Sequence, residues 1–575
     1  MTRGYIIDVK PLKRKLKLIF EKGVEAEIST TFPLYLILDN PEPLLEHPAV
    51  ERFEEEGWYF PPDYKKKGTV YRIEINDLSY YDDIVKRAKE RLRAIHVNTY
   101  PSVLTQTLLR LKAYPMHLIS VENGRVTLLE EEGSLSMPDL KIATVETYSW
   151  YGLSEKGEKY KLYLNGEEID SGYTKDFEFN EFVDLAECMG VTCKGFRKVT
   201  VRIDLTKAFL RAKGLMEWSK LSKTLLREIR YGKIGKVVTT NVAIKALRRK
   251  YLIPDIKVNV EKAKTLDQLA RADKGGLILI PKPGCYNNVY QMDFSSFYPS
   301  IIIKYNISPE TIDECEDVKT DIGHSICFKR RGIVPEALEE IVNRKEALKR
   351  IDEERAEATK WVLVASFGYL GYRHSRFGRI EAYELVTYFS RKNMREAMKI
   401  IENNGGKILH AIVDSIFYQG DNDISYEVEK TLGFRVKSEK YNWVIFTQSG
   451  GYGVPTRYVA RYPDGKVKVK GLIRENLPFV VKRFLQESVN ILAEAETCEQ
   501  AREKIVEVDL MKEELLSKLE PQDFVIKIKD RAYLRGSNGF YNAELGYSGV
   551  NLEYYRDYVN RWEEILLSPL YIMNG

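Results

Sequence analysis

The architecture of this chain can be traced outward from "YQMDFSSFYPSII", residues 290–302. The segment begins as an apolar strand, reaches a carboxylate at Asp293 and continues into a tight turn rich in hydroxyl groups. A carboxylate at the end of a buried strand is costly unless it is paired or binds a metal ion. Asp293 is therefore expected to have a partner, with a simple turn cap as the alternative.

A second lone carboxylate, Asp414, lies in "KILHAIVDSIFYQG", residues 407–420. Two short apolar runs flank it, a pattern that predicts a β-hairpin. If the strands of Asp293 and Asp414 lie side by side, they form a dicarboxylate site. Such a site suits two divalent cations about 3.5–4 Å apart that clamp an in-line phosphoryl displacement. Mg²⁺ prefers oxygen ligands and usually takes one or two carboxylates plus substrate phosphates.

Length and composition set the limits of the fold. The 575 residues predict three to five domains or subdomains. A hydrophobic fraction of 44% and a charged fraction of 30% are typical of globular proteins with ample core. The net charge of +5 permits a nucleic-acid partner without establishing one. No apolar run approaches the ~18 residues of a membrane span, so no membrane association is expected.

The six cysteines are scattered and contain no CxxC pair. This spacing predicts neither a zinc module nor a disulfide framework. It suits a reducing cytoplasm, which is the expected location. Abundant Lys, Glu and Arg resemble the surface chemistry of thermophilic proteins.

Periodicity gives a coarse secondary structure. Residues 1–135 alternate strand-like runs with turns, and residues 335–364 have a helical period that predicts two helices with a break near Ile351–Glu353. A β-rich region follows the hairpin, with Asp464-Gly465 as a turn. The last hundred residues are expected to be mostly helical.

Four segments resemble motifs of family-B DNA polymerases, in the order of that family. "DFSSFYPSII" (293–302) resembles motif A, DxxSLYPSI, and "KWVLVASFGYLGY" (360–372) resembles motif B, KxxxNSxYG. "HAIVDSIF" (410–417) resembles motif C, YGDTDS, and "TRYVARYPDGKVKVKGL" (456–472) resembles the DNA-gripping KKxY segment. The resemblance covers nearly the whole chain. The chain looks like a member of a short archaeal branch of the family with degenerate motifs.

The resemblance implies an α/β multidomain fold of the right-hand polymerase type, with palm, fingers and thumb beside an N-terminal domain and an exonuclease-like domain. The implied boundaries are 1–135 for the N-terminal domain, 136–250 for the exonuclease-like domain, 251–336 and 367–475 for the palm, 337–366 for the fingers and 476–575 for the thumb. The implied partners are primer–template DNA and dNTP. A sliding clamp or accessory replication proteins are candidate further partners.

The resemblance also assigns residues. Asp293 and Asp414 would be catalytic and would bind two Mg²⁺ or Mn²⁺ ions, with the carbonyl of Phe294 as a further ligand. In motif C, Ile412 replaces the first Asp, so slow chemistry is expected. The residues implied to bind the nucleotide are Phe294, Ser295, Ser296 and Phe297 (through backbone amides across 295–297 and the Ser296 side chain), Tyr298 (which would exclude a 2′-OH), Arg344, Lys360, Val364 and Phe367.

DNA contacts are implied for Gly368, Arg457, Tyr458 and Lys470, with basic side chains on phosphates supplying affinity without sequence reading. In the exonuclease-like region, "IATVETY" has Thr144 where the family's first acid stands, and Glu146 remains. A two-metal nuclease needs several converging carboxylates. No proofreading is therefore expected.

These residues are compatible with three functions to different degrees. The first is a weak template-directed DNA polymerase without proofreading, for which a role in repair or lesion bypass stays open. The second is a catalytically inactive polymerase-fold protein that binds DNA or serves as a scaffold, favoured by Ile412 and Val364. The third, a nuclease, is disfavoured by Thr144.

Overall fold

The computed structural model describes residues 1–151, 156–231, 233–256, 263–272, 274–528 and 531–572. Its contacts divide the chain into two compact units, each built from two stretches of sequence. The first unit comprises Met1–Ala272 and Tyr298–Val386, and the second comprises Asp273–Phe297 and Thr387–Gly575. The finer division into six segments stays a prediction. In the described ranges, no helix is both long enough and apolar enough to cross a membrane.

Two sheets form from the N-terminal segment of the first unit, where strand-like runs and turns were expected. One has the order β3-β2-β1-β8-β9 and the other β5-β6-β4-β7. Alternating apolar side chains such as Val9 and Leu18 fill the core of the first sheet. The elements are β1 (Thr2–Leu12), β2 (Lys15–Phe20), β3 (Glu25–Ser29), β4 (Phe32–Ile37), β5 (Val50–Tyr59), β6 (Lys67–Ile75), α1 (Tyr81–Leu92), β7 (Ile95–Val97), α2 (Val103–Leu111), β8 (Leu118–Glu122) and β9 (Arg125–Leu128).

A third sheet of the first unit has the order β12-β11-β10-β13-β14. Strand β10 pairs antiparallel with β11 and parallel with β13, and β13 pairs parallel with β14. This mixed sheet occupies the region in which an exonuclease-like domain was expected. Its strands are β10 (Ile142–Tyr151), β11 (Lys156–Leu164), β12 (Glu167–Tyr173), β13 (Phe179–Cys188) and β14 (Phe196–Asp204).

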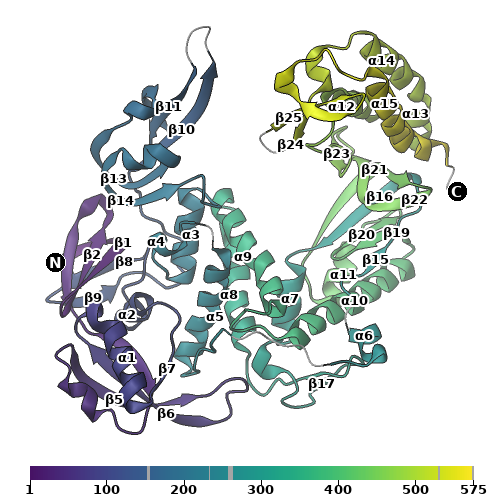
Figure 1. The fold of residues 1–575 in the computed structure, drawn as a ribbon. Coiled ribbons are helices and arrows are strands. Elements are labelled where there is room, and N and C mark those ends of the chain that lie inside the picture. The colour runs from purple at the N-terminus through teal and green to yellow at the C-terminus, as the bar shows by residue number, and fades with distance from the viewer. Residues whose placement is uncertain (152–155, 232, 257–262, 273, 529–530, 573–575) are drawn as a thin grey trace. The chain divides into compact units, whose positions relative to one another are not determined.

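Helices α3, α5, α8 and α9 lie side by side in the first unit (Figure 1). The predicted break between two finger helices is confirmed, because α8 ends at Leu348 and α9 begins at Glu353. Asp352 caps α9 by accepting a hydrogen bond from the Arg355 amide at 3.2 Å. The remaining elements are α3 (Ala212–Ser222), α4 (Leu226–Ile229), α5 (Ile234–Arg248), α6 (Leu266–Ala272), β17 (Val318–Lys319), β18 (Ser325–Ile326), α8 (Ile333–Leu348) and α9 (Glu353–Gly371). Helices α7 (Phe297–Lys304) and α10 (Ile380–Asn403) each begin in one unit and end in the other.

The second unit is built on a seven-stranded sheet of order β15-β19-β20-β16-β21-β22-β23. Strand β16 is central and pairs antiparallel with β20 and β21. The hairpin predicted at residues 407–420 is confirmed as β19 and β20, and the predicted Asp464-Gly465 turn joins β22 to β23. The elements are β15 (Ile278–Leu279), β16 (Gly284–Phe294), β19 (Lys407–Ile412), β20 (Ser415–Gln419), α11 (Ser425–Leu432), β21 (Val436–Ser449), β22 (Tyr452–Arg461) and β23 (Val467–Lys470).

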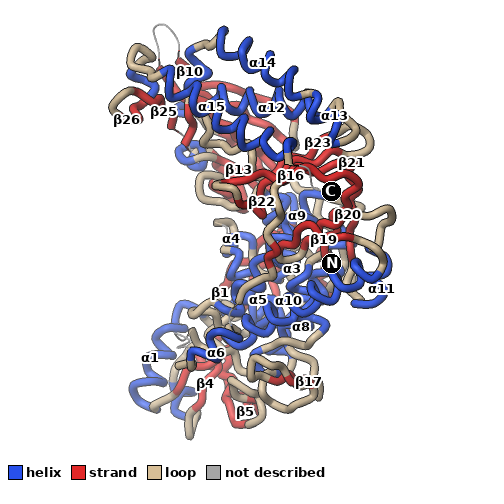
Figure 2. Tube along the Cα trace, turned by 90° about the vertical axis from the view of Figure 1, so that its right-hand side faces the viewer, coloured by secondary structure: helices blue, strands red, loops and turns tan. Residues whose placement is uncertain are grey.

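The C-terminal part of the second unit is mostly helical, as expected, with an additional sheet of three strands (Figure 2). Phe484 and Tyr555, on two of these helices, share a buried core with Trp443 of β21. The core therefore ties the helices to the seven-stranded sheet. The elements are α12 (Phe479–Ala493), α13 (Cys498–Glu503), α14 (Ile505–Ser517), β24 (Ile526–Ile528), β25 (Arg531–Gly536), β26 (Gly539–Asn542) and α15 (Leu552–Leu567).

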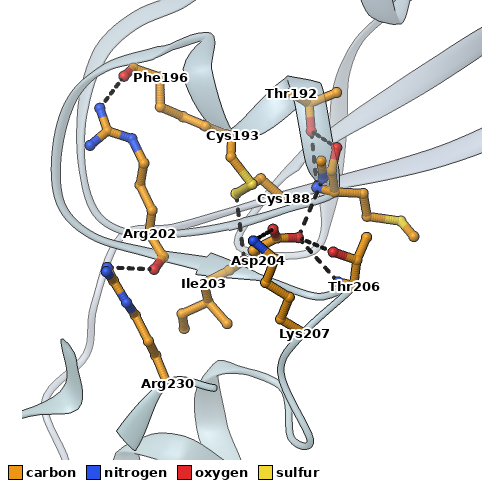
Figure 3. The surroundings of a disulfide bond; sticks show 12 residues. Cys188, Thr192, Cys193, Phe196, Arg202, Ile203, Asp204, Thr206, Lys207 and Arg230 are labelled. Atoms are coloured by element: carbon orange, nitrogen blue, oxygen red, sulfur yellow. Dashed lines mark hydrogen bonds and ion pairs between the residues drawn. A yellow bond between two sulfur atoms is a disulfide. The ribbon is translucent and has the colours of Figure 1, made fainter. Parts of the chain in front are cut away.

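The expectation that the chain has no disulfide framework was wrong. All six cysteines are paired, as Cys188–Cys193, Cys285–Cys498 and Cys315–Cys327. Figure 3 shows the first pair, beside Asp204. Residues 285 and 498 are 213 positions apart, so only the folded sheet reveals their proximity. Intracellular proteins of hyperthermophiles are disulfide-rich exceptions to the rule for reducing compartments.

Candidate active site

The two predicted metal ligands lie at the ends of neighbouring strands. Asp293 is the penultimate residue of β16, and Asp414 lies in the turn between β19 and β20. The β16–β20 register places Asp293 opposite Ser415, the residue that follows Asp414. The Phe294 amide donates a hydrogen bond to the Asp414 carbonyl oxygen at 2.9 Å. The structure thus brings the two strand-end acids together, while their role as ligands stays a prediction.

The turn that carries Asp414 is strained. Val413 has a φ of 55°, although β-branched residues rarely adopt the left-handed region. The Asp414 amide donates to the Ile412 carbonyl at 2.6 Å, which makes Val413 the centre of a γ-turn with positive φ. The Val413 amide donates to the Leu277 carbonyl at 2.8 Å. Such strain persists only where the surroundings fix it, and it is common at functional sites.

The electrostatics of the pair favour a bound cation. Asp414 is exposed at its turn, yet partial desolvation by the surrounding chain and the neighbouring Asp293 carboxylate raise its pKa to about 6. Burial also raises the pKa of Asp293, against opposing hydrogen bonds and the charge of Lys468. Among the described side chains, none donates a hydrogen bond to the Asp414 carboxylate. Two adjacent carboxylates with raised pKa values and oxygen-only donors match the ligands that Mg²⁺ and Mn²⁺ prefer, so the residues fit divalent cations.

A polar network behind Asp293 was missed in the sequence. Gln291 donates to Asp293 Oδ1 at 3.3 Å, and its own carbonyl accepts from Lys468 at 3.1 Å. Side chains two residues apart share a strand face, so Gln291 could have been found as the polar neighbour of Asp293. Lys468 could not, because its place depends on how β21, β22 and β23 pair.

The backbone amides of motif A serve partly in the fold. The Phe294 amide is used by Asp414, and the Ser295 amide donates to the Arg435 carbonyl at 2.9 Å. The prediction that the Ser295 amide faces a triphosphate was therefore wrong. Ser296 has a φ of 48° and leads into α7, which begins at Phe297; for these two residues the role stays a prediction. The Phe294 ring is buried and stacks on Phe297 with centroids 4.4 Å apart.

Motifs A and B meet through aromatic rings in the first unit. The ring centroids of Tyr298 and Phe367 are 4.3 Å apart. Phe367 also stacks on Tyr383 of α10, at 4.5 Å. Tyr298 is thus braced from one side, as a residue that excludes a 2′-OH by its bulk must be.

One face of α9 presents the predicted motif B residues to solvent. Lys360, Val364 and Gly368 recur every fourth residue and are all exposed. Val364 is 59% exposed, unusual for a valine in the middle of a helix. Among the residues that the structure describes, Lys360 forms an ion pair with Glu357 alone, one turn away, at 3.1 Å. This face is available to bind a ligand, and the roles of its residues stay predictions.

The prediction that Arg344 clamps a triphosphate was wrong. Arg344 is 8% exposed, and its guanidinium pairs with the buried Glu217. It also donates to the carbonyls of Gly133 and Ser134 at 3.1 and 3.0 Å. Arg355 shares the same carboxylate at 2.8 Å. Arg344 therefore ties α8 to α3, and four of its five N–H donors are engaged in these contacts.

Two of the predicted DNA contacts are also buried. Arg457 is 6% exposed and donates to the Thr447 hydroxyl at 2.7 Å. Tyr458 is equally buried, and its hydroxyl lies 3.4 Å from Gln291 Oε1. Both predictions were wrong, because β22 turns these side chains into the unit. Lys470 is exposed on β23, and its contact with DNA stays a prediction.

The acids of the exonuclease-like sheet are held in structural contacts. Thr144 donates to Glu187 Oε2 at 2.9 Å, and the Ala212 amide donates to Glu187 Oε1 at 2.6 Å. Both oxygens of this buried carboxylate are thus in use. Glu146 is half exposed and pairs with Arg211 at 3.4 Å. Glu187 is the acid that the sequence did not single out, and each of its oxygens already accepts one hydrogen bond.

Comparison with known proteins places these features in a family. The model of DNA polymerase family B matches residues 226–429. DNA polymerase 2 of Saccharolobus solfataricus is 44% identical over 563 residues, which cover 97% of this chain and 86% of that protein. DNA polymerase 2 of Aeropyrum pernix is 30% identical over 223 residues, or 34% of this chain and 27% of that protein.

The solved structure of the family B DNA polymerase from Pyrobaculum calidifontis has a TM-score of 0.70 to this chain at 16% sequence identity and covers 100% of both chains. This likeness shows the predicted α/β multidomain, right-hand polymerase fold. Together with the relative that is similar over nearly the full length, it shows that the chain belongs to the archaeal family-B DNA polymerases.

Proposed function

We propose that this chain joins the α-phosphate of a dNTP to a primer 3′-OH at Asp293 and Asp414, slowly and without proofreading. As a family-B polymerase, the chain is a template-directed DNA polymerase with DNA and dNTP as substrates. The observation that carries the site assignment is the pairing of β16 with β20, which sets the two strand-end acids side by side. No other neighbouring pair of acids with raised pKa values lies at adjoining strand ends among the residues described.

Within this proposal, Asp293, Asp414 and the Phe294 carbonyl hold two Mg²⁺ or Mn²⁺ ions. When bound, such ions stabilise the charge that develops on the attacking and leaving oxygens. The strained turn at Val413 holds the backbone of Asp414 in a fixed position relative to β16. A rigid pair of ligands lowers the reorganisation that the transition state requires.

The first unit supplies residues that we assign to nucleotide recognition. Lys360 offers a point charge for the triphosphate. Tyr298, braced by Phe367, blocks a ribose 2′-OH. Val364 and Gly368 complete an open face against a nascent base pair. In the second unit, Lys470 binds a DNA phosphate.

Slow chemistry follows from Ile412. The family's first motif C acid is an isoleucine here, so one carboxylate near the metal ligands is missing. The absence of proofreading follows from Thr144, which stands where an acid would be needed, and from the structural hydrogen bonds of Glu187. A weak and unedited polymerase suits repair or lesion bypass, which we include in the proposal together with a cytoplasmic location and a sliding clamp or accessory proteins as further partners.

Primer extension with Mg²⁺ or Mn²⁺ tests the proposal. Wild-type protein is expected to extend a primer, and Asp293→Ala to lose this activity by a factor of at least ~10³, the scale of one essential group at a reacting centre. Asp421→Ala, in the exposed turn after β20, is the control and should extend at the wild-type rate. Equal extension by wild type and Asp293→Ala would refute the site. No extension by wild type on any template would favour the inactive DNA-binding or scaffold protein.

A further inference from the structure

Lys468 lies in a polar cluster behind the site, with Gln291, Glu439 and Tyr441. Its ammonium donates to Gln291 Oε1 at 3.1 Å, to the Tyr441 hydroxyl at 3.0 Å and to the Glu439 carboxylate. Gln291 is 6% exposed, and Lys468 retains only 22% of its side-chain surface. The Lys468–Glu439 ion pair is partly exposed, since Glu439 retains 36% of its side-chain surface, and such pairs contribute little to stability. The cluster therefore calls for a functional account.

The cluster fixes which way the Gln291 amide points. Lys468 can only donate hydrogen bonds, so the amide oxygen must face it. The Tyr441 hydroxyl lies 2.8 Å from the same oxygen and 2.6 Å from the Glu439 carboxylate, and its single proton can be donated to either. The amide nitrogen is thereby turned toward Asp293 Oδ1 at 3.3 Å and Ser415 Oγ at 3.1 Å. Without Lys468, the amide could flip and set its oxygen against the carboxylate.

We propose that Lys468 and Gln291 are positioning residues that orient the Asp293 carboxylate for divalent cations. In hydrogen bonding Lys468 acts through Gln291, since among the described residues no hydrogen bond joins Lys468 to Asp293 directly, while its charge also lowers the pKa of Asp293. Glu439 holds the ammonium in place from the other side. Partners of this kind typically contribute 10–100-fold in metal affinity. This inference rests on the proposed role of Asp293 as a metal ligand.

These hydrogen bonds from Lys468 through Gln291 to Asp293, here called the relay, also explain why β23 has a lysine at this position. Val467 and Val469 flank Lys468, and the strand pairs with β22 so that Lys468 lies opposite Ala460. A small neighbour leaves room for the long side chain to turn toward β16. The two other lysines of this segment, Lys466 and Lys470, remain exposed. One of three similar lysines is thus recruited to the site.

Titration of the 575-residue protein with Mn²⁺ alone tests this inference. The EPR signal of free Mn²⁺ is lost on binding and measures the affinity. Lys468→Met and Gln291→Leu are each expected to weaken Mn²⁺ binding about tenfold or more. Lys468→Arg, which is still an obligate donor, should restore most of it. The double variant should bind as weakly as Gln291→Leu alone, because one residue acts through the other. Lys466→Met, whose side chain is 81% exposed, is the matched control and should bind as wild type does.

A purely structural role would lower the melting temperature without moving the Mn²⁺ affinity of the folded protein. If Lys468→Met does not fold, Lys468→Gln takes its place, since it removes the obligate donor at similar length. Wild-type Mn²⁺ affinity in Lys468→Met and Gln291→Leu, or additive losses of affinity in the double variant, would overturn the relay. Asp293→Ala separates this from the proposed function. If it leaves Mn²⁺ binding intact, the metal assignment itself fails; if it abolishes binding while the others bind normally, only the relay fails.

Discussion

The amide of Phe294 donates a hydrogen bond to the carbonyl oxygen of Asp414 at 2.9 Å, so the residue after one predicted metal ligand is bonded to the other. This single contact joins the end of β16 to the β19–β20 turn. It fixes the backbones of the two residues relative to each other, so the side-chain rotamers alone still set the distance between the carboxylates. The predictions below follow from this arrangement and its neighbours.

Replacing Asp414 by Asn is expected to stabilise the metal-free protein at pH 8. The pKa of Asp414 is about 6 in the folded protein, above the ~3.9 of an unfolded chain. Between these values the folded state binds more protons, so stability falls as pH rises through this window and stays lower above it. Melts in EDTA should therefore show a higher Tm for Asp414→Asn at pH 8 and little difference near pH 4. Asp421→Asn is the control, and an equal gain there would contradict the assignment.

Ile412→Asp should raise the rate of primer extension. The new carboxylate would lie beside Asp414 and act on the metals and primer end, so the gain should appear in kcat more than in the KM for dNTP. Stability should fall without metal, because Ile412 pairs with Ser415 and Ile278 in an apolar setting, and should partly recover with Mg²⁺. Steady-state kinetics and melts with and without Mg²⁺ measure both effects. Ile412→Asn separates charge from size. An Ile412→Asp protein that folds, binds DNA and extends no faster would move suspicion to Val364.

Tyr298→Ala should admit ribonucleotides. Its ring is braced against Phe367 at 4.3 Å, so it cannot readily yield to a 2′-OH. Loss of the ring should reduce discrimination between dNTP and rNTP at least about tenfold, or ~1.4 kcal/mol. Competing single-nucleotide incorporation measures the ratio. Tyr298→Phe keeps the ring and should keep the discrimination; unchanged selectivity in Tyr298→Ala would disprove the role.

Thr144→Asp should not create a proofreading nuclease. Glu187, its neighbour on β13, already accepts a bond from the Ala212 amide, and a new acid at 144 would replace a donor with a repelling charge. We expect a lower Tm and no metal-dependent trimming of a mispaired primer. Wild-type protein and Glu146→Ala serve as matched samples. Trimming that is present in wild type and lost in Glu146→Ala would show an intact nuclease site.

Removal of the Cys285–Cys498 disulfide should cost far more stability than removal of Cys188–Cys193. The first closes a separation of 213 residues and the second a separation of 5. Loop-closure entropy predicts about 5 and about 2 kcal/mol respectively, as upper figures. Denaturant unfolding of Cys498→Ser and Cys193→Ser under oxidising conditions compares them. Equal losses, or no effect of dithiothreitol on wild type, would contradict this ranking.

Local pattern was enough to predict the hairpin and its acid. Asp414 lies between two apolar runs, and alternation with a turn is a short-range signal. The break before α9 was equally readable, because Asp352 and the acids that follow it form a helix start. The motif resemblance then supplied the partner strand of Asp293.

Burial was what the sequence could not provide. Arg344 and Arg457 look like free cations, yet both are buried. Glu217, 127 positions away, pairs with the first, and Thr447 and the Gln448 carbonyl on the adjacent strand β21 accept from the second. Lys468 shows the opposite case, because nothing in the sequence singled it out and it lies in the network behind Asp293. Helix and strand periods assign a face to a residue, but tertiary packing decides what that face meets.

The place of β16 at the centre of its sheet has a consequence for biosynthesis. Its register partner on β20 follows 124 residues later, which at ribosomal rates of 5–20 residues per second means a delay of roughly 6–25 s. Throughout that interval an apolar strand has left the ribosome without the neighbours that will bury it. Most of the intervening chain, Tyr298–Val386, belongs to the first unit, which can condense first. The nascent polymerase is therefore expected to be most vulnerable to chaperone capture and aggregation just before the β19–β20 hairpin emerges.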